Sequence, residues 1–239
     1  MTRSDSNFPL QDYYADIYST YDRINRIFTF GRDRSWRKKA VSACLRNNPG
    51  EILDVCSGTG DFALALAAEP GLRIIGYDFS AEMLGEAKRK QELSADQLRS
   101  SLEFKEGDVG QMPFKEHQFD AMGITFGIRN LVYENSNAEK HLSELCRVLK
   151  PGGRFVILES SKPGNLIWRV FNNIYLRLIL PYLGGILSGN FKAYGYLAKS
   201  SRNYYTISEM ENILKKAGFK IVSRQSLFLG SVMLVVAEK

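Results

Sequence analysis

The fold is decided by the stretch from Glu51 to Asp61, which reads Glu-Ile-Leu-Asp-Val-Cys-Ser-Gly-Thr-Gly-Asp. Its short apolar run, residues 52–55, predicts a buried strand. Gly58 and Gly60 then permit a tight turn and a close approach of the backbone to a ligand. An apolar helical pattern begins directly after them. A strand, a glycine turn and a helix N-terminus in this order predict a nucleotide-type binding site.

The next predicted strand supplies the second half of that site. Residues 73–78 read Arg-Ile-Ile-Gly-Tyr-Asp, so the strand ends in the carboxylate of Asp78. An acid at this place can accept hydrogen bonds from both hydroxyls of a ribose. The turn matches neither the dinucleotide pattern GxGxxG nor the phosphate-binding pattern GxxxxGKS. The two halves together favour a nucleoside without phosphates over an ordinary α/β turn with an incidental surface acid.

Length and composition set broad limits on the class of protein. The chain has 239 residues, which suits one domain spanning residues 1–239, and its net charge of +6 fits an anionic partner, a membrane surface or simple solubility. Cys44, Cys56 and Cys146 match no zinc spacing or disulfide framework, so we expect a reducing, cytoplasmic location. The start of the chain lacks the apolar core of a signal peptide. No apolar run reaches the roughly 18 residues that span a bilayer.

Strands and helices alternate along most of the chain. The expected strands cover residues 52–55, 73–78, 102–108, 119–126, 154–160, 219–228 and 232–237. This spacing implies βαβ units, and therefore an α/β fold with a mostly parallel sheet. Gly230-Ser231 joins the last two strands, which predicts an antiparallel pair at the end. Ligands of open parallel sheets bind beyond the carboxyl ends of the strands, where the acids and the glycine turn fall.

Two helical segments lie outside this alternation. Between residues 12 and 48, apolar residues recur every three or four positions, Tyr21 among them, which predicts amphipathic helices covering the open end of the sheet. Residues 162–205 are rich in Leu, Ile, Tyr and Phe and contain Lys and Arg but neither Asp nor Glu. We expect this second segment to be an inserted helical lid, with an apolar helix over residues 166–180.

The two predicted strands with their glycine turn and acid resemble motifs I and II of class I methyltransferases that use S-adenosylmethionine (SAM). Four stretches narrow the resemblance to the UbiE-type ubiquinone/menaquinone biosynthesis C-methyltransferases: residues 21–25, 53–61, 126–130 and 147–154. The Tyr-Asp-x-x-Asn helix and the Phe-Gly-Ile-Arg-Asn loop are the most specific of them. The chain departs from the family at Cys56-Ser57, where Ala-Gly is usual, and at Ser160, where Phe is usual.

The resemblance implies a Rossmann-like SAM-methyltransferase fold and roles for particular residues. The implied cofactor contacts are Ser57, Gly58, Thr59 and Gly60 at the methionine end, Asp78 at the ribose, Asp108 and Val109 at the adenine, and Thr125. The catalytic candidates are Arg129, Asn130 and Tyr21, and no metal is expected.

Methyl transfer to a ring carbon needs a nucleophilic carbon aligned with the methyl group. In a hydroquinone, loss of a phenol proton places electron density on the neighbouring carbon, so the enzyme must favour that phenolate. Arg129 is a poor base because an arginine pKa lies above roughly 12. We interpret it as an electrostatic stabiliser or the organiser of a water that takes the proton, with Asn130 orienting that group. The alternatives are a surface ion pair for Arg129 and a core aromatic for Tyr21.

The predicted reaction is C-methylation of a polyprenylated quinol, with demethylmenaquinol favoured over the ubiquinone precursor or another small aromatic. A nucleic acid substrate is disfavoured because the loop at residues 125–130 lacks the prolines of base N-methyltransferases. The apolar helix is interpreted either as a lid that rests peripherally on anionic lipid or as a homo-oligomer interface. His117 and His141 are interpreted as structural or solvated rather than catalytic.

Overall fold

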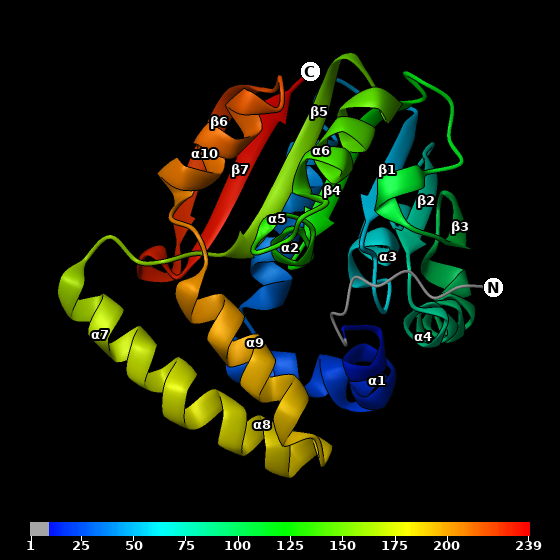
Figure 1. Cartoon of the computed structure of the whole chain (residues 1–239). Helices are drawn as coiled ribbons and strands as arrows, with labels where there is room; N and C mark the ends of the chain where they lie inside the picture. Colours follow the sequence, from blue (N-terminus) through cyan, green and yellow to red (C-terminus); the bar gives the residue numbers. More distant parts are fainter. Residues whose placement is uncertain (1–9) are drawn as a thin grey trace.

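A seven-stranded sheet forms the centre of the computed structural model, which describes residues 10–239 (Figure 1). The start of the chain, where the sequence argued against a signal peptide, lies outside the described residues. The strand order is β3-β2-β1-β4-β5-β7-β6. The strands are β1 (Glu51–Val55), β2 (Arg73–Asp78), β3 (Ser101–Glu106), β4 (Phe119–Thr125), β5 (Leu149–Ser160), β6 (Lys220–Leu227) and β7 (Val232–Glu238).

The pairing of the strands confirms the predicted sheet. Strands β1 to β5 pair in parallel, whereas β7 runs antiparallel to both β5 and β6. Successive strand residues face opposite sides, so Ile52 enters the core on one face and Leu53 the core on the other. Both faces of β1, β2 and β4 are therefore buried, which explains their largely apolar sequences, whereas the edge strand β3 is mostly exposed and carries charged residues.

Helices cover both faces of the sheet (Figure 1). One face is covered by α2 (Asp33–Cys44), α3 (Asp61–Ala67) and α4 (Ala81–Leu93). The other is covered by α5 (Ile128–Val132), α6 (Ala138–Val148) and α10 (Ile207–Lys216). Short 3-10 turns lie at Ala95–Gln97, Val109–Gln111 and Phe228–Gly230.

A third group of helices lies across the carboxyl ends of the parallel strands (Figure 1). It consists of α1 (Leu10–Phe28), α7 (Leu166–Ile174), the π-turn η3 (Tyr175–Ile179), α8 (Leu180–Ser188) and α9 (Phe191–Asn203). Ile24 of α1 is buried with Ala193 and Tyr194 of α9. The segments predicted as an N-terminal cover and an inserted lid thus meet beside the predicted ligand site.

The long helix of the inserted segment differs from its prediction. Helical backbone continues past Leu180 to Ser188, so the run is 23 residues long rather than ending at 180, and it is long and apolar enough to cross a membrane by length and composition alone. Pro181 sits in the first turn of α8, where its missing N–H costs little, and the π-turn directly before it absorbs the change in hydrogen bonding. Only 17% of the apolar window is buried.

Candidate active site

The glycine turn after β1 opens the backbone toward the carboxyl edge of the sheet. Gly60 has φ +80°, and a Cβ there would lie 2.8 Å from the Phe104 ring, so a side chain is excluded. Gly58 has φ +54°, and a Cβ there would meet nothing within 4 Å. The turn therefore packs against the protein interior at Gly60 and leaves space for a ligand at Gly58.

The carboxylate of Asp78 anchors this turn. Its two oxygens accept hydrogen bonds from the backbone N–H of Gly58 at 2.8 Å and of Ser80 at 3.0 Å. The side chain is only 5% exposed, and burial raises the pKa of Asp78. The backbone N–H of Phe79 also contacts this carboxylate. A carboxylate offers roughly four acceptor positions, so Asp78 retains capacity for about one further donor such as a hydroxyl. The hydroxyl of Ser57 nearby is buried and has no hydrogen-bond partner among the residues that the structure describes.

A cavity of about 590 Å³ collects most of the predicted site. The predicted cofactor residues that line it are Ser57, Gly58, Thr59, Asp78, Asp108, Val109 and Thr125. Two predicted catalytic residues, Tyr21 and Asn130, line the same cavity. One space therefore joins the predicted nucleoside wall to the predicted acceptor wall, although the residues come from widely separated parts of the chain.

Two predicted residues do not line the cavity. Gly60 is buried beneath the turn against Phe104. Arg129 is 3% exposed and lies in the short helix α5, where the sequence predicted a loop. Its Nη1 lies 3.5 Å from Oε1 of Glu159, which is fully buried at the end of β5.

The ion pair of Arg129 is embedded in hydroxyl contacts. The Arg129 Nη1 donates to the Ser160 hydroxyl at 2.9 Å and to the Ser201 hydroxyl of α9 at 2.8 Å. Glu159 Oε1 in turn accepts from the backbone N–H and the hydroxyl of Ser160, both at 2.7 Å. The pair is buried, so the surface ion pair weighed for Arg129 is wrong. This cluster connects α5, β5 and the lid directly behind Asn130.

Tyr21 contributes a neutral hydroxyl to the cavity wall. Burial raises the pKa of Tyr21 to about 12, although a hydrogen bond with Asn25 opposes the shift. The phenol therefore keeps its proton at neutral pH and can donate a hydrogen bond. Asn25 also lines the cavity.

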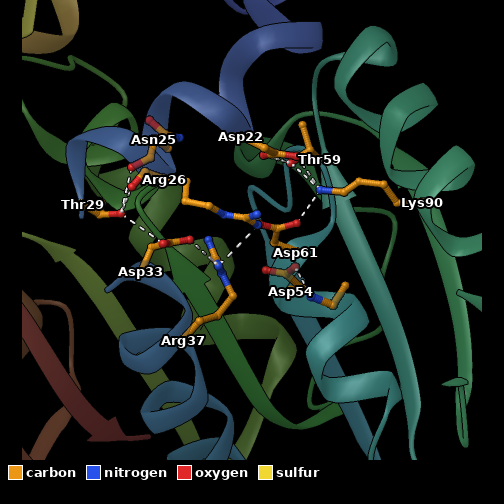
Figure 2. A network of polar contacts seen from close by, with 11 residues as sticks. Asp22, Asn25, Arg26, Thr29, Asp33, Arg37, Asp54, Thr59, Asp61 and Lys90 are labelled. Atoms are coloured by element: carbon orange, nitrogen blue, oxygen red, sulfur yellow. Dashed lines mark hydrogen bonds and ion pairs between the residues drawn. The ribbon is translucent and has the colours of Figure 1, made fainter. Parts of the chain in front are cut away.

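Several charged residues in the cavity wall were not among the predicted cofactor contacts or catalytic residues: Asp22, Asp33, Arg37 and Asp61. Figure 2 shows them joined in a polar network with Lys90. The Thr59 hydroxyl donates to Asp22 at 2.7 Å, so the cofactor turn is tied directly to α1. The Tyr-Asp-x-x-Asn stretch could have predicted that Asp22 belongs to the site, because Asp22 is next to Tyr21 in the sequence and Asn25 follows one helical turn later.

His141 lies closer to the site than its sequence suggested. It lines the cavity, its Nδ1 lies 2.9 Å from the Leu131 carbonyl, and its Nε2 lies 3.9 Å from Asp108. His117 lies in an exposed turn and takes no part in the cavity. Within residues 10–239, no group of three or more His, Cys, Asp or Glu side chains is arranged to hold a metal ion.

Comparison with known proteins identifies the family of the chain. The model of the ubiE/COQ5 methyltransferase family matches residues 1–239. The chain belongs to that family. The demethylmenaquinone methyltransferase of Thermus thermophilus is 40% identical over 209 residues, 87% of this chain and 91% of the relative. The ubiquinone/menaquinone biosynthesis C-methyltransferase UbiE of Geobacter sulfurreducens is 36% identical and aligns with 96% of this chain and 88% of its own length.

Solved structures agree on the fold. A SAM-dependent methyltransferase from Thermotoga maritima, described as a possible histamine N-methyltransferase, superposes with a TM-score of 0.65 at 17% identity, covering 96% of this chain and 99% of its own. A family member with this fold is a SAM-dependent C-methyltransferase, so SAM is the cofactor. The cavity fits it: Asp78 keeps acceptor capacity for the ribose, and the buried Ser57 hydroxyl beside the open turn still needs a partner.

Proposed function

We propose that this protein transfers the methyl group of SAM to a ring carbon of demethylmenaquinol and forms menaquinol. One observation carries the proposal: the cavity that holds the predicted cofactor residues is also lined by Tyr21 and Asn130. The relatives are named for demethylmenaquinone and for ubiquinone/menaquinone biosynthesis, and Tyr21 and Asn130 offer polar groups to the oxygens of a quinol ring. We place the enzyme in the cytoplasm as one domain, with residues 12–48 as its cover and 162–205 as its lid.

Bound SAM supplies an activated methyl group whose carbon–sulfur bond breaks as the new carbon–carbon bond forms. Two protons must leave the quinol: the phenol proton, whose loss gives the phenolate, and, after methylation, the proton of the methylated ring carbon. Water takes both, and the phenolate oxygen regains one when menaquinol forms. The Tyr21 phenol stays protonated, so it donates a hydrogen bond to the quinol oxygen and favours the phenolate. Asn130, from its own part of the cavity wall, orients the quinol ring toward the methyl group.

Arg129 acts from behind the wall in this proposal. It lies next to Asn130 in α5, and its positive charge is held in place by Glu159, Ser160 and Ser201. A fixed charge in a buried site stabilises nearby negative charge more strongly than it would in water. We therefore assign Arg129 an electrostatic and orienting role, and water as the acceptor of the proton.

Substrate access requires contact with lipid, because a polyprenyl quinol stays in the membrane. The α7–α8 face, residues 166–188, exposes large apolar side chains that include Ile167, Phe171, Tyr182 and Ile186. The surrounding segment contains Lys and Arg but no acid. A second copy of this face would bring like charges together, whereas anionic lipid would complement them. We propose that this face rests on the membrane and that α9 links it to the catalytic cluster.

The membrane proposal is tested by reversing exposed charges at Arg177, Lys192 and Lys199 to Glu. Binding to vesicles containing phosphatidylglycerol should weaken, and more so at low salt, since each basic residue near such a surface contributes about 1 kcal/mol. Arg169 is unsuitable because its Nε donates to the Pro163 carbonyl at 2.8 Å. Lys215→Glu on α10 is the matched control. Unchanged vesicle binding, with a dimer that dissociates in the variant, would favour a homo-oligomer interface instead.

The reaction itself is tested with methyl-labelled SAM and three acceptors: demethylmenaquinol, the ubiquinone precursor and RNA. Mass spectrometry should find the label on a ring carbon of the first. Labelled RNA without a labelled quinol would overturn the proposal.

A further inference from the structure

One wall of the cavity carries a row of paired charges from four helices (Figure 2). Asp22 of α1 pairs with Lys90 of α4 at 2.6 Å, and Lys90 also pairs with Asp61 of α3. Arg37 of α2 lies between Asp61 and Asp33. Such alternation of acids and bases fits a ligand that carries both signs of charge, as the amino-acid portion of SAM does.

The order of the strands places this wall at the methionine end of the cofactor. The residues implied for the adenine follow β3, and the ribose acid Asp78 ends β2. Because β1 is the next strand along the edge, the amino-acid portion extends toward the turn after β1 and toward α3, which begins at Asp61. Helix α2 packs beside α3, so Arg37 and Asp61 stand where that portion ends.

The guanidinium of Arg37 is held in one direction by two ion pairs, but not all of its N–H donors are used in them. Its Nη1 lies 3.2 Å from Asp33 and 3.4 Å from Asp61, both longer than the Lys90–Asp22 pair. Its Nε is buried and has no partner among the described residues. A guanidinium carries five N–H donors, so two carboxylates that share one nitrogen fix its direction and leave donors for a ligand.

We propose that Arg37 binds the α-carboxylate of SAM. A planar guanidinium matches a carboxylate through two parallel hydrogen bonds, which a lysine cannot reproduce. Asp33 lies four residues before Arg37 on the same side of α2 and orients its guanidinium through their ion pair. Lys90 contacts both Asp22 of α1 and Thr59 of the glycine turn, and so holds α1 against that turn. The inference deepens the cofactor site of the proposed function and is independent of which quinol is methylated.

The test compares two ligands that differ only in the carboxylate: SAM and decarboxylated SAM. Isothermal titration calorimetry on Arg37→Gln should show SAM affinity reduced about tenfold or more. Affinity for decarboxylated SAM should stay within about twofold of the wild-type value. Arg34→Gln, at an exposed position on the same helix, should leave both affinities unchanged.

Two results would overturn the inference. Equal weakening of both ligands would mean that Arg37 only supports the fold of the site, and unchanged SAM affinity would mean that it does not touch the ligand. If Arg37→Gln does not fold, Arg37→Lys keeps the charge and should still lose SAM affinity selectively. Absence of SAM binding in the wild-type chain would instead overturn the cofactor assignment, so the two failures are distinguishable.

Discussion

The buried pair of Arg129 and Glu159 makes the most demanding prediction. The two side chains are 4% and 0% exposed, with 3.5 Å between Nη1 and Oε1. At an effective dielectric constant of about 20, this separation corresponds to an attraction of about 5 kcal/mol. Desolvation offsets much of that attraction while both partners are present, but removal of one partner leaves an uncompensated buried charge. Glu159→Gln should therefore lower the free energy of unfolding by about 3–5 kcal/mol.

Urea denaturation followed by circular dichroism measures this loss, and a double-mutant cycle isolates the pair. Arg129→Met should be destabilising for the same reason, because it strands the Glu159 carboxylate. Arg129→Met combined with Glu159→Gln should recover part of the loss, so that the double variant is more stable than the sum of the single effects. Glu86→Gln, which breaks the more exposed pair with Arg89, should change stability far less than Glu159→Gln, because water screens that pair.

Additive effects in the cycle would refute this reasoning, and so would a Glu159→Gln variant within about 0.5 kcal/mol of wild type. The rate of quinol methylation provides a second test of the Arg129–Glu159 pair. If Glu159 holds Arg129 in place behind the acceptor wall, quinol turnover in the folded variant should fall while SAM affinity is retained.

Three further predictions concern the cavity. Asp78→Ala should weaken SAM binding by about 3 kcal/mol through the lost ribose hydrogen bonds; calorimetry showing unchanged affinity in a folded variant would contradict it. Tyr21→Phe should slow turnover. Because the pKa of Tyr21 is raised to about 12, the wild type and the variant should show the same dependence of rate on pH up to pH of about 10. A fall in the wild-type rate below that pH that is absent from the variant would show that Tyr21 loses its proton there, and would contradict its role as a neutral hydrogen-bond donor. Burial alone would raise the pKa of Asp61, but Arg37 and Lys90 lower it below its usual value. That stabilisation is present above pH of about 4 and is lost as the pH falls, so Lys90→Gln should shift acid unfolding to higher pH, and an unmoved midpoint would count against it.

Local patterns were sufficient for most of the fold. The strand ending in Asp78 and the turn at residues 56–60 were predicted from short stretches, because a buried strand needs an apolar run and a left-handed turn needs glycine. The antiparallel final pair was likewise visible from Gly230-Ser231. The helix in the inserted segment was predicted too short, because the π-turn that lets helical backbone continue into Pro181 leaves no clear trace in the hydrophobic pattern.

The sequence by itself determined the order of the parallel strands along the chain and the glycine turn, and the residues predicted to contact SAM follow strand ends that must meet at one edge of such a sheet. Only the tertiary structure decided the partners of the charges. Arg37, Asp61 and Lys90 lie on three different helices, and no spacing along the chain reveals which of them pair. The same holds for Arg129, whose sequence position suggested a loop at the acceptor. Its burial against Glu159 depends on how α5, β5 and the lid pack together, and that packing is a property of the whole fold.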